Sequence, residues 1–528
     1  MNVFGTDGIR GRVEPDMLGT EEAIDALVDR RRLSPTLAWL VAAAAARTYD
    51  RGGPAPLAVV GWDRRPENPA LVRAVTHALR SNGWRVLHLG TCATPLVHHV
   101  LITEGASLGV MVTASHNPAH DSGLKLFDAE GRKSTPAMEQ RISDLVVVLA
   151  QEDHPLGDLD GESLSAPDDV LDNAAHRHAA WLDHRHQELA GIFGLSGMDV
   201  SAADRPLLLD ASGGSARTWL AAWLSERGCP TVEVSGTVDV LNEGCGAGAF
   251  SPGQRWTWAE AETSTHLLLR SLAPSPAGRV VAAALDGDGD RCLLLQSTED
   301  GVAVVDGDAM ALAILRASSS SGPWTLAASI ESDLALTTEA LGMDHVAAVH
   351  PTAVGDRWLS VALAGEEGHH VIGVEDSGHL VLPWSHHQDG PVRLVGDGAA
   401  SLLAVLLAGI GRSGPVPAPG GWKLRRSIAP ADRSRWTGAG PLATEVVDCL
   451  TRLLPDADEV VHGPLDNEPD LLRVEARLGG ARVSLGVRNS GTQAKTSISL
   501  RTDTPSLAPR MLDVMEQVEA VLRPALTP

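Results

Sequence analysis

Short apolar runs alternate with amphipathic stretches along most of this chain. Residues 56–63 (PLAVVGWD) predict a strand with a turn, residues 67–83 a helix, and residues 84–90 the next strand. The same order returns at 206–236 and at 324–351. This alternation is typical of βα units in mostly parallel sheets, so the sequence predicts one α/β module that is used at least three times.

The last hundred residues follow another pattern. Residues 471–491 alternate apolar and polar positions on both sides of Gly479-Gly480, which predicts two strands joined by a tight turn. Residues 511–526 carry apolar positions at helical spacing and predict a closing helix. A smaller α+β domain therefore fits this region.

Two segments rich in turn-forming residues separate the modules. The acidic segment 151–169 indicates a surface excursion, and the Pro/Gly-dense segment 411–421 indicates a linker. We therefore expect four domains, three of them α/β with mixed, mostly parallel sheets and the last α+β. Their expected bounds are residues 1–175, 176–303, 304–418 and 419–528.

The charge and the cysteine content narrow the classes of partner. The 528-residue chain has a formal net charge of −24 and no run of five or more Lys/Arg residues, so we expect no nucleic acid and no anionic membrane surface as a partner. Its five cysteines are scattered and form no CxxC pair, which indicates neither a disulfide framework nor a zinc site. This usage fits a reducing cytoplasm.

The most apolar early stretch, residues 37–46, is too short to span a bilayer. Ser34 and Pro35 come directly before it and are typical of a helix N-cap and first turn, so we expect an ordinary buried helix there. The sequence opens on a glycine-rich segment rather than a signal peptide. We therefore expect a cytoplasmic protein.

The sharpest chemical signal is LDGDGDR at residues 285–291, directly after an apolar strand pattern. Side chains at alternate positions of an extended chain share a face, so Asp286, Asp288 and Asp290 can converge on one point. Three converging carboxylates repel one another unless a cation lies among them, and hard oxygen ligands suit Mg²⁺. A solvated acidic turn is the alternative. An EF-hand loop would need other residues where Arg291 and Ser297 stand.

A second signal is TASHNP at residues 113–118, which follows a predicted buried strand and ends regular structure at Pro118. This loop presents Ser115 at the end of the strand. The alternative is a turn with an incidental serine, because a Ser beside a His is no triad and no GxSxG elbow is present. Together with a three-carboxylate site, however, a phosphorylated serine would supply a further ligand to Mg²⁺.

A third signal is VRNSGTQAK, where Arg488 can grip a phosphate with its planar fork. Ser490, Gly491 and Thr492 add hydroxyls and closely approachable amides in a tight turn. A plain hairpin turn is the alternative.

A fourth and weaker signal is GVEDSGH at residues 373–379. Glu375 and Ser377 point to one side if this loop is extended. A polar surface loop is the alternative.

These four patterns, in this order and one in each predicted domain, closely resemble the α-D-phosphohexomutase superfamily over the whole chain. Further matches are FGTDGIRG at 4–11, GxDxR at 61–65, SGLKLF with Lys125, NEGCG at 242–246, VDGD at 305–308 and VGDRW at 354–358. Within the superfamily, the loops are most similar to those of phosphoglucosamine mutases, with the phosphomannomutase/phosphoglucomutase branch next.

The resemblance implies four domains around a central cleft and a set of site residues. It implies that Ser115 is phosphorylated and that Ser115 and the three aspartates bind Mg²⁺. It implies sugar contacts from Glu375, Ser377 and His379, and contacts to the substrate phosphate from Arg488, Ser490, Gly491 and Thr492. In the mechanism that follows, Arg10, Lys125 and Arg291 add positive charge, and either His116 or Lys125 moves the hydroxyl proton.

The expected reaction interconverts a hexose 6-phosphate and a hexose 1-phosphate. It passes through a phosphoserine and a hexose 1,6-bisphosphate, which also acts as the activator, and glucosamine 6-phosphate is the favoured substrate. The small-molecule sugar phosphate is then the partner, and we expect a monomer or a homodimer.

The sequence also departs from the family pattern. The unusual residues are Pro351, Ala353, Val374, Asp376, Gln493 and Ala494. They leave the identity of the sugar open, so a phosphomannomutase/phosphoglucomutase and a non-catalytic sugar-phosphate-binding paralogue are alternatives. A Mg²⁺-dependent phosphatase is a third, although it would need an aspartyl or water nucleophile instead of a presented serine.

Overall fold

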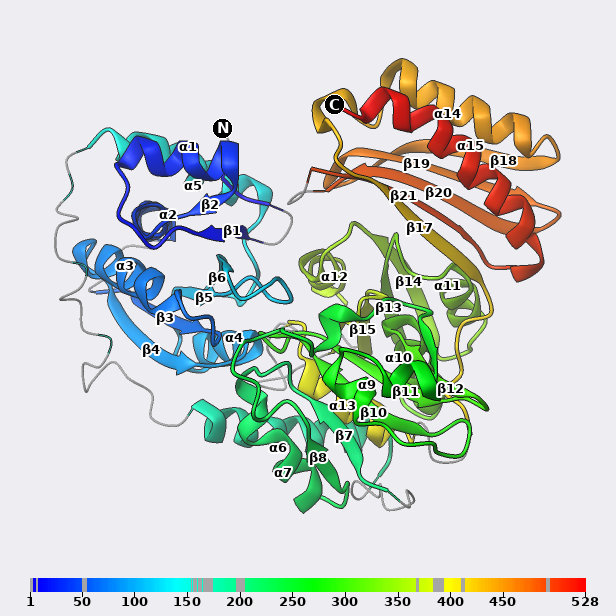
Figure 1. The fold of residues 1–528 in the computed structure, drawn as a ribbon, viewed down its shortest axis with the longest axis horizontal. Helices are drawn as coiled ribbons and strands as arrows, with labels where there is room; N and C mark the ends of the chain where they lie inside the picture. Colours follow the sequence, from blue (N-terminus) through cyan, green and yellow to red (C-terminus); the bar gives the residue numbers. More distant parts are fainter. Residues whose placement is uncertain are drawn as a thin grey trace. The chain divides into compact units, whose positions relative to one another are not determined.

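Figure 1 shows the computed structural model of the chain. Its residues form two compact units. The described residues are 3–5, 8–49, 55–152, 154, 159, 164, 174–195, 205–366, 370–382, 394–409, 414–490 and 494–528. Unit 1 comprises Met1–Gly307 and Ser377–Val416, and unit 2 comprises Asp308–Asp376 and Pro417–Pro528. Each unit is described by itself.

The first sheet of unit 1 has six strands in the order β2-β1-β6-β5-β3-β4. The strands are β1 (Ile9–Val13), β2 (Arg32–Leu33), β3 (Leu57–Trp62), β4 (Arg85–Thr91), β5 (Leu108–Val112) and β6 (Asp121–Asp128). β3 is parallel to β4 and β5, whereas β6 is antiparallel to β1 and β5. The predicted strand–helix–strand unit over residues 56–90 is confirmed, with a helix, α3, at Asn68–Ser81.

Helices cover both faces of this sheet. They are α1 (Thr20–Arg30), α2 (Pro35–Tyr49), α3, α4 (Thr94–Thr103) and α5 (Pro136–Ala150). Alternate residues of β3 point to opposite faces, so Ala58 and Val60 join the core beneath α2 and α3, while Val59 joins the core beneath α4. The predicted buried helix is α2, and the Leu37 backbone amide donates to Ser34 Oγ at 3.3 Å as an N-cap contact.

The second sheet of unit 1 has the order β8-β7-β10-β11-β12-β9. Its strands are β7 (Leu207–Asp210), β8 (Thr231–Glu233), β9 (Arg255–Thr257), β10 (Val280–Leu285), β11 (Cys292–Ser297) and β12 (Gly301–Val305). β7 is parallel to β8 and β10, and the remaining neighbours are antiparallel, so this sheet is the most mixed.

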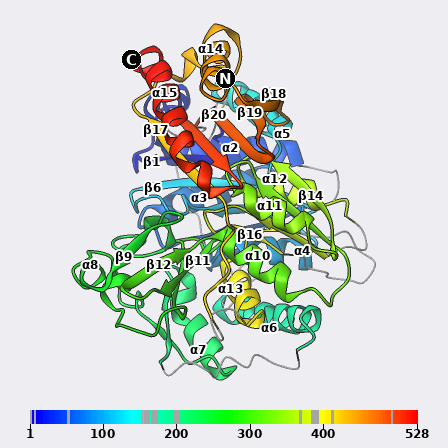
Figure 2. The ribbon, with the colours of Figure 1, turned by 90° about the vertical axis from the view of Figure 1, so that its right-hand side faces the viewer.

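The other helices of unit 1 lie around these strands. They are α6 (Ala174–Ile192), η2 (Ser215–Thr218), α7 (Leu220–Glu226), η3 (Ala247–Ala249), α8 (Trp258–Glu262), α9 (Leu267–Arg270) and α13 (Gly398–Leu407); the short strand β16 (Leu380–Val381) precedes α13. α6 and α13 pack side by side (Figure 2).

Unit 2 begins with parallel strands in the order β14-β13-β15. They are β13 (Trp324–Ser329), β14 (Val346–Thr352) and β15 (His370–Val374), with helices α10 (Gly307–Ala317), α11 (Leu334–Leu341) and α12 (Asp356–Leu363). The third predicted βα repeat, at 324–351, therefore folds as expected.

The rest of unit 2 is a five-stranded antiparallel sheet in the order β17-β21-β20-β19-β18. Its strands are β17 (Trp422–Ile428), β18 (Ala457–Leu465), β19 (Glu468–Leu478), β20 (Ala481–Asn489) and β21 (Thr496–Thr502). It also contains η4 (Arg433–Arg435), α14 (Gly440–Leu453), η5 (Pro505–Leu507) and α15 (Ala508–Leu526). α14 and α15 lie along one face of this sheet (Figure 1).

The predicted hairpin at Gly479-Gly480 and the predicted closing helix are both present in this C-terminal part. Three regions with α/β sheets and one α+β region match the expected fold class, while the four exact domain bounds stay a prediction. Among the described helices, none is long and apolar enough to cross a membrane.

Candidate active site

The loop that carries Ser115 leaves the first sheet at the end of β5. Ser115 is 2% exposed and has a φ of 53°, in the left-handed region that non-glycine residues rarely adopt. Its backbone amide donates to Thr113 Oγ1 at 2.8 Å, and Thr113 Oγ1 donates to Asp63 Oδ2 at 2.6 Å. The surrounding contacts therefore hold this serine in an unusual backbone conformation.

One buried guanidinium, that of Arg65, holds the carbonyls of the serine loop. Arg65 Nη2 donates to the Ser115 carbonyl at 2.6 Å, and Arg65 Nε pairs with Asp63 Oδ2 at 3.0 Å. Arg65 Nη1 donates to the carbonyls of Asn117, Pro118 and Asp121. The GxDxR segment thus fixes the loop through the several donors of a planar fork.

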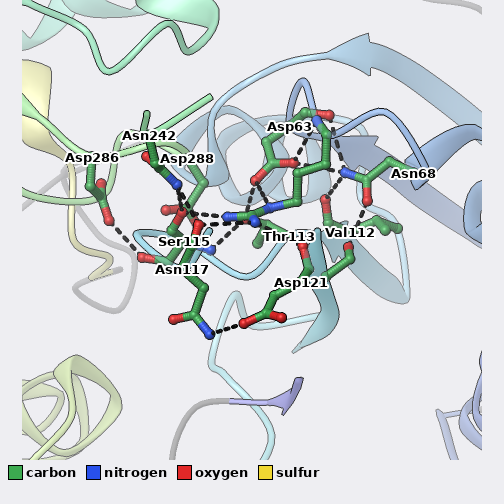
Figure 3. A network of polar contacts seen from close by, with 12 residues as sticks. Asp63, Asn68, Val112, Thr113, Ser115, Asn117, Asp121, Asn242, Asp286 and Asp288 are labelled. Atoms are coloured by element: carbon green, nitrogen blue, oxygen red, sulfur yellow. Dashed lines mark hydrogen bonds and ion pairs between the residues drawn. The ribbon is translucent and has the colours of Figure 1, made fainter. Parts of the chain in front are cut away.

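A residue from the second sheet's region also holds the loop. Asn242 Nδ2 donates to the carbonyls of Ser115 and Asn117, both at 2.8 Å (Figure 3). Asn242 Oδ1 accepts from Ser212 Oγ at 2.6 Å. The sequence contained the signal, because Asn242 opens the NEGCG match, but that match assigned it no role.

The acidic loop leaves the second sheet at the end of β10. The carboxylates of Asp286, Asp288 and Asp290 are each at most 1% exposed, and one oxygen of each lies within 4.8 Å of the others. A Cβ at Gly287 would lie 2.9 Å from the Ser115 carbonyl oxygen, so glycine permits the close approach of the two loops. The structure thus brings the three predicted carboxylates together.

The same loop lies against the predicted nucleophile. Ser115 Oγ donates to Asp286 Oδ2 at 2.6 Å, as Figure 3 shows. Residues 171 positions apart in the sequence are therefore in direct contact. A single cation among the carboxylates would be within reach of the serine oxygen or of a phosphate attached to it.

Two buried cations compensate the carboxylates. Lys125 Nζ donates to Asp288 Oδ2 at 2.8 Å and to Asp290 Oδ2 at 2.6 Å. Arg291 Nε pairs with Asp286 Oδ2 at 3.0 Å, and its Nη2 lies 3.3 Å from Ser115 Oγ. The positive charges that were expected of Lys125 and Arg291 thus lie at the acidic loop.

The two carboxylate oxygens of Asp288 differ in their hydrogen bonds. Its Oδ2 accepts a 2.7 Å hydrogen bond from Thr94 Oγ1 in addition to that from Lys125. Its Oδ1 is buried without a hydrogen-bond partner in the described part of the chain. A buried oxygen of this kind is costly, and a hard divalent cation would satisfy it. Sequence reasoning missed Thr94, which carries no motif signal of its own.

The pKa values of the carboxylates reflect this crowding. Burial raises the pKa of Asp286 to about 6, and the charges of Asp290 and Asp288 add to the effect while Arg291 opposes it. Burial also acts to raise the pKa of Asp290, but Lys125 and then His379 hold it well below the usual range. Two of the three carboxylates are thus strongly perturbed, as is typical of functional sites.

His116 stands beside the guanidinium of Arg291. Arg291 Nη2 donates to His116 Nδ1, and this cation, more than burial, lowers the pKa of His116 to about 2. The charge of Arg10, on β1, contributes to the same lowering. His116 is therefore neutral, and since its Nδ1 accepts a hydrogen bond, its ring proton is on Nε2.

The predicted sugar-reading loop contributes to unit 1 through its second half. His379 Nε2 lies 3.2 Å from Asp290 Oδ1, and Ser377 Oγ lies 3.3 Å from His379 Nδ1. A Cβ at Gly378, which has a φ of 95°, would be 2.3 Å from the Cys292 carbonyl oxygen. Glycine thus allows Ser377 and His379 to come close to the acidic loop.

Glu375, the first predicted residue of that loop, belongs to unit 2. It is 6% exposed, and its Oε1 accepts from the Gly355 amide at 2.8 Å. Gly355 lies in the VGDRW match, so the structure joins two family segments that sequence reasoning treated separately. Ala353 is buried just before it, and Pro351 lies on the edge strand β14, where a missing N–H is tolerated.

The predicted phosphate loop follows β20 in unit 2. Arg488 pairs with Glu331, its Nη2 lying 3.1 Å from Glu331 Oε1. The Ser490 amide donates to the Lys495 carbonyl at 2.9 Å, which closes the turn. Gly491, Thr492 and Gln493 lie outside the described residues.

Acidic partners of the unit 2 cations were not predicted. Glu331 Oε2 also pairs with Arg425 Nη2 at 3.0 Å. Asp376, one of the unusual residues, pairs with both Lys423 and Arg425 at 3.1 Å. Glu331 follows the carboxyl end of β13, a position that often carries function in parallel sheets, and this was the only available signal.

The fold and this cluster define an α/β enzyme built for phosphoryl transfer. Family models for the phosphoglucomutase/phosphomannomutase alpha/beta/alpha domain I and domain III match residues 1–151 and 306–413. A phosphoglucosamine mutase of Nocardia farcinica is 30% identical over 538 aligned residues, which cover 98% of this chain and 99% of that protein. The chain therefore belongs to the phosphoglucomutase/phosphomannomutase family, the α-D-phosphohexomutases.

Solved structures of this family share the fold. A phosphoglucomutase/phosphomannomutase family protein from Burkholderia thailandensis aligns with a TM-score of 0.63 at 19% identity, covering 99% of this chain and 98% of that one. An N-acetylphosphoglucosamine mutase of Aspergillus fumigatus, solved with GlcNAc-6P and magnesium, aligns with a TM-score of 0.53 at 18% identity, covering 93% and 99%. Both likenesses support the expected four-domain α/β fold class.

Proposed function

We propose that this protein interconverts glucosamine 6-phosphate and glucosamine 1-phosphate through a phosphorylated Ser115 and a bisphosphate intermediate. The match to phosphoglucosamine mutase over nearly the whole chain supports the reaction and the sugar. A phosphomannomutase/phosphoglucomutase reaction is the second candidate, because the family models carry that description.

One observation carries the proposal: Ser115 Oγ lies 2.6 Å from Asp286 within a buried cluster of three carboxylates. The strained backbone of Ser115 and its contact with the acidic loop support a functional role over that of an incidental turn residue. If the acidic loop belonged to a phosphatase, the buried serine beside it would have no role in the reaction.

The donor set fits a divalent cation. Asp286, Asp288 and Asp290 would hold Mg²⁺ together with an oxygen of Ser115 or of its phosphate, and Asp288 Oδ1 is the unsatisfied ligand. When bound, Mg²⁺ supplies charge that stabilises the oxygens of the transferring group. Lys125 holds Asp288 and Asp290 in place, and its positive charge reduces the repulsion between their two carboxylates.

In the transfer step, the bond between Ser115 Oγ and phosphorus breaks while a bond forms between phosphorus and the sugar hydroxyl oxygen. The hydroxyl proton ends on Ser115 Oγ. Arg291 Nη2, 3.3 Å from that oxygen, faces the negative charge that develops on it. The return of the other phosphate reverses each of these changes, so the serine ends phosphorylated again.

The contacts of His116 and Lys125 favour the same role for both candidates for proton transfer. His116 Nδ1 is occupied by Arg291, so His116 offers an N–H through Nε2 and suits a phosphate oxygen rather than a proton to be removed. Lys125 is held as an ammonium by two carboxylates. Both residues therefore act as donors that orient the transferring group before the proton moves.

A bisphosphate must turn over between the two half-reactions, and a trace of hexose 1,6-bisphosphate would phosphorylate an empty Ser115. The phosphate that is not reacting needs its own holder. Arg488, together with Ser490, Gly491 and Thr492, would bind it, and Glu375, Ser377 and His379 would contact the sugar hydroxyls.

The test offers purified protein glucosamine 6-phosphate, mannose 1-phosphate and glucose 1-phosphate, each with Mg²⁺ and a trace of the corresponding bisphosphate. We expect isomer formation to be fastest with the amino sugar and ³²P from labelled bisphosphate to be retained on Ser115. Ser115→Ala should lose both signals. Release of free phosphate at the rate of substrate loss would instead identify a phosphatase, and tight binding without any isomer would identify a binding paralogue.

A further inference from the structure

A cavity in unit 1 lies beside the active-site loops but contains none of the residues assigned above. It has a volume of about 240 Å³ and lies between the start of α6, the residues that follow β4, and η2. Its polar lining includes Arg64, Arg217, His178 and Trp219, and Leu96 is among its apolar lining.

The two guanidiniums in this cavity carry unused donors. Arg64 Nη1 donates to the Gly213 carbonyl at 2.5 Å, and Arg217 Nη1 donates to the carbonyls of Gly236 and Val238 at 2.9 and 3.2 Å. Within the described chain neither forms an ion pair with a carboxylate. Each therefore retains Nη2 and Nε for a ligand.

The two arginines also repel each other. Burial and then the charge of Arg217 lower the pKa of Arg64, and Asp239 offsets this only in part. Two guanidiniums that share a cavity without a paired carboxylate are stabilised by an anion placed between them. A phosphate dianion matches both their charge and their planar forks.

Two further polar atoms at the cavity lack partners. His178 is 3% exposed, and its Nε2 is buried without a hydrogen-bond partner in the described residues. The Trp219 indole Nε1 is likewise buried and unpartnered there. The two rings lie 4.9 Å apart between centroids, and both residues line this cavity. Buried polar atoms are rarely left unpaired, which makes these two an independent sign of a missing ligand.

We propose that this cavity binds a small organic phosphate monoester, with the phosphate between Arg64 and Arg217 and the organic part against Trp219 and Leu96. The indole N–H donates to a polar group of the ligand, and one nitrogen of His178 donates or accepts according to its tautomer. This site does not depend on the reaction proposed above, because none of its residues belongs to that mechanism.

Two residues that line the cavity, Arg64 and Ala93, adjoin residues of the catalytic loops or of their supports. Arg64 precedes Arg65, which holds the Ser115 carbonyl. A Cβ at Gly289 of the acidic loop would lie 3.2 Å from Ala93, which lines the cavity. A ligand bound to Arg64 would therefore contact the sequence neighbour of Arg65, the residue that positions the serine loop.

The test is calorimetric titration of the full chain with phenyl phosphate, a probe that carries both a phosphate and a ring. We expect two binding events in the wild type. The double variant Arg64→Met/Arg217→Met should lose one of them, while Arg488→Ala should weaken only the other. Arg85→Met, an exposed arginine of β4, serves as the matched charge control and should keep both.

The Trp219→Phe variant tests the site without removing charge, since it keeps a ring and deletes the N–H. We expect at least tenfold weaker binding at the event that the double arginine variant loses, with an unchanged circular dichroism spectrum. Two undiminished events in the arginine double variant would overturn the proposal. So would the loss of all binding in Arg488→Ala alone.

Discussion

The two compact units hold their cations in different ways. In unit 1, Lys125 is 2% exposed and is fixed by two aspartates with no exposed surface. In unit 2, Arg488 and Arg425 share Glu331, and their side chains are 15% and 37% exposed. A fixed, buried charge suits chemistry at one point, whereas a guanidinium that shares its carboxylate can exchange it for a substrate phosphate.

The comparison also separates two uses of acidic residues. The carboxylates of unit 1 lie close together and need a cation. Glu331 and Asp376 in unit 2 each pair with two cationic side chains, whereas the three aspartates of unit 1 share Lys125 and Arg291. The following predictions test this division, from the largest expected effect to the smallest.

Removing the Arg65 fork should have the largest effect on unit 1. Arg65→Met leaves Asp63 as an unpaired buried charge and several loop carbonyls without donors, so we expect a loss of about 3 to 5 kcal/mol in the stability of unit 1. Differential scanning calorimetry would show this as a lowered first transition. A variant that melts like the wild type would mean that Asn242 alone holds the serine loop.

Asp288→Asn should reduce turnover by about 10²- to 10³-fold, because one buried carboxylate of the cluster loses its charge. The matched control is Asp376→Asn, a buried acid of unit 2 that contacts Lys423 and Arg425 instead of the serine. Initial rates at saturating Mg²⁺ compare the two variants. If both lost activity equally, the division between chemical and supporting carboxylates would fail.

Arg488→Ala should lower kcat/KM by about 10- to 100-fold, which corresponds to the loss of one charge-assisted phosphate contact of about 1.5 to 3 kcal/mol. Labelling of Ser115 by a bisphosphate and the affinity for Mg²⁺ should change much less. Arg477→Ala, an exposed arginine on the neighbouring strand β19, is the control. Wild-type kinetics in Arg488→Ala would remove this residue from the phosphate site.

Asp333→Asn should stabilise unit 2 in a pH-dependent way. Burial raises the pKa of Asp333 from its usual value of 3.8 to about 6 in the folded protein, so the ionised form is disfavoured by folding. The variant should gain nothing below about pH 4 and about 1 to 2 kcal/mol above about pH 6. Asparagine keeps the cap that accepts from the Ala335 amide.

Urea unfolding of unit 2 at several pH values checks this smallest effect. The folded state keeps the proton of the Asp333 carboxyl to higher pH than the unfolded state does. The stability of wild-type unit 2 therefore falls as pH rises from about 4 to 6. A constant difference between the two proteins across that range would contradict the assignment.

Local sequence pattern predicted the parts of the site that lie within one loop. The spacing of Asp286, Asp288 and Asp290 on an extended segment predicted their convergence. In the structure the three carboxylates do converge, but around a turn in which Gly289 has a φ of 70°. The strand before Ser115 and the proline after it placed the serine in a loop for the same kind of local reason. The contact between these two loops was a hypothesis, because no local rule joins residues 115 and 286.

What could not be predicted depends on residues far apart in the sequence. Asn242 holds the serine loop from another sheet's region, and Glu331 pairs with arginines on two strands of the C-terminal sheet. A single sequence gives no register between such segments. The Arg64 cavity is a stronger case, since Arg64, His178, Arg217 and Trp219 come from three separate segments. Of these four, only Arg64 lies within a motif, at a variable position of GxDxR.

The formal charges around Ser115 bear on how a phosphate can enter a buried centre. Three aspartates contribute three negative charges, and the two cations that pair with them directly, Lys125 and Arg291, contribute two positive charges, which leaves one negative charge within the cluster. A divalent ion would change the total to one positive, and a doubly charged phosphate on the serine would return it to one negative. The centre stays within one unit of electroneutrality in each state, so no stage of the cycle leaves a large uncompensated charge out of contact with water.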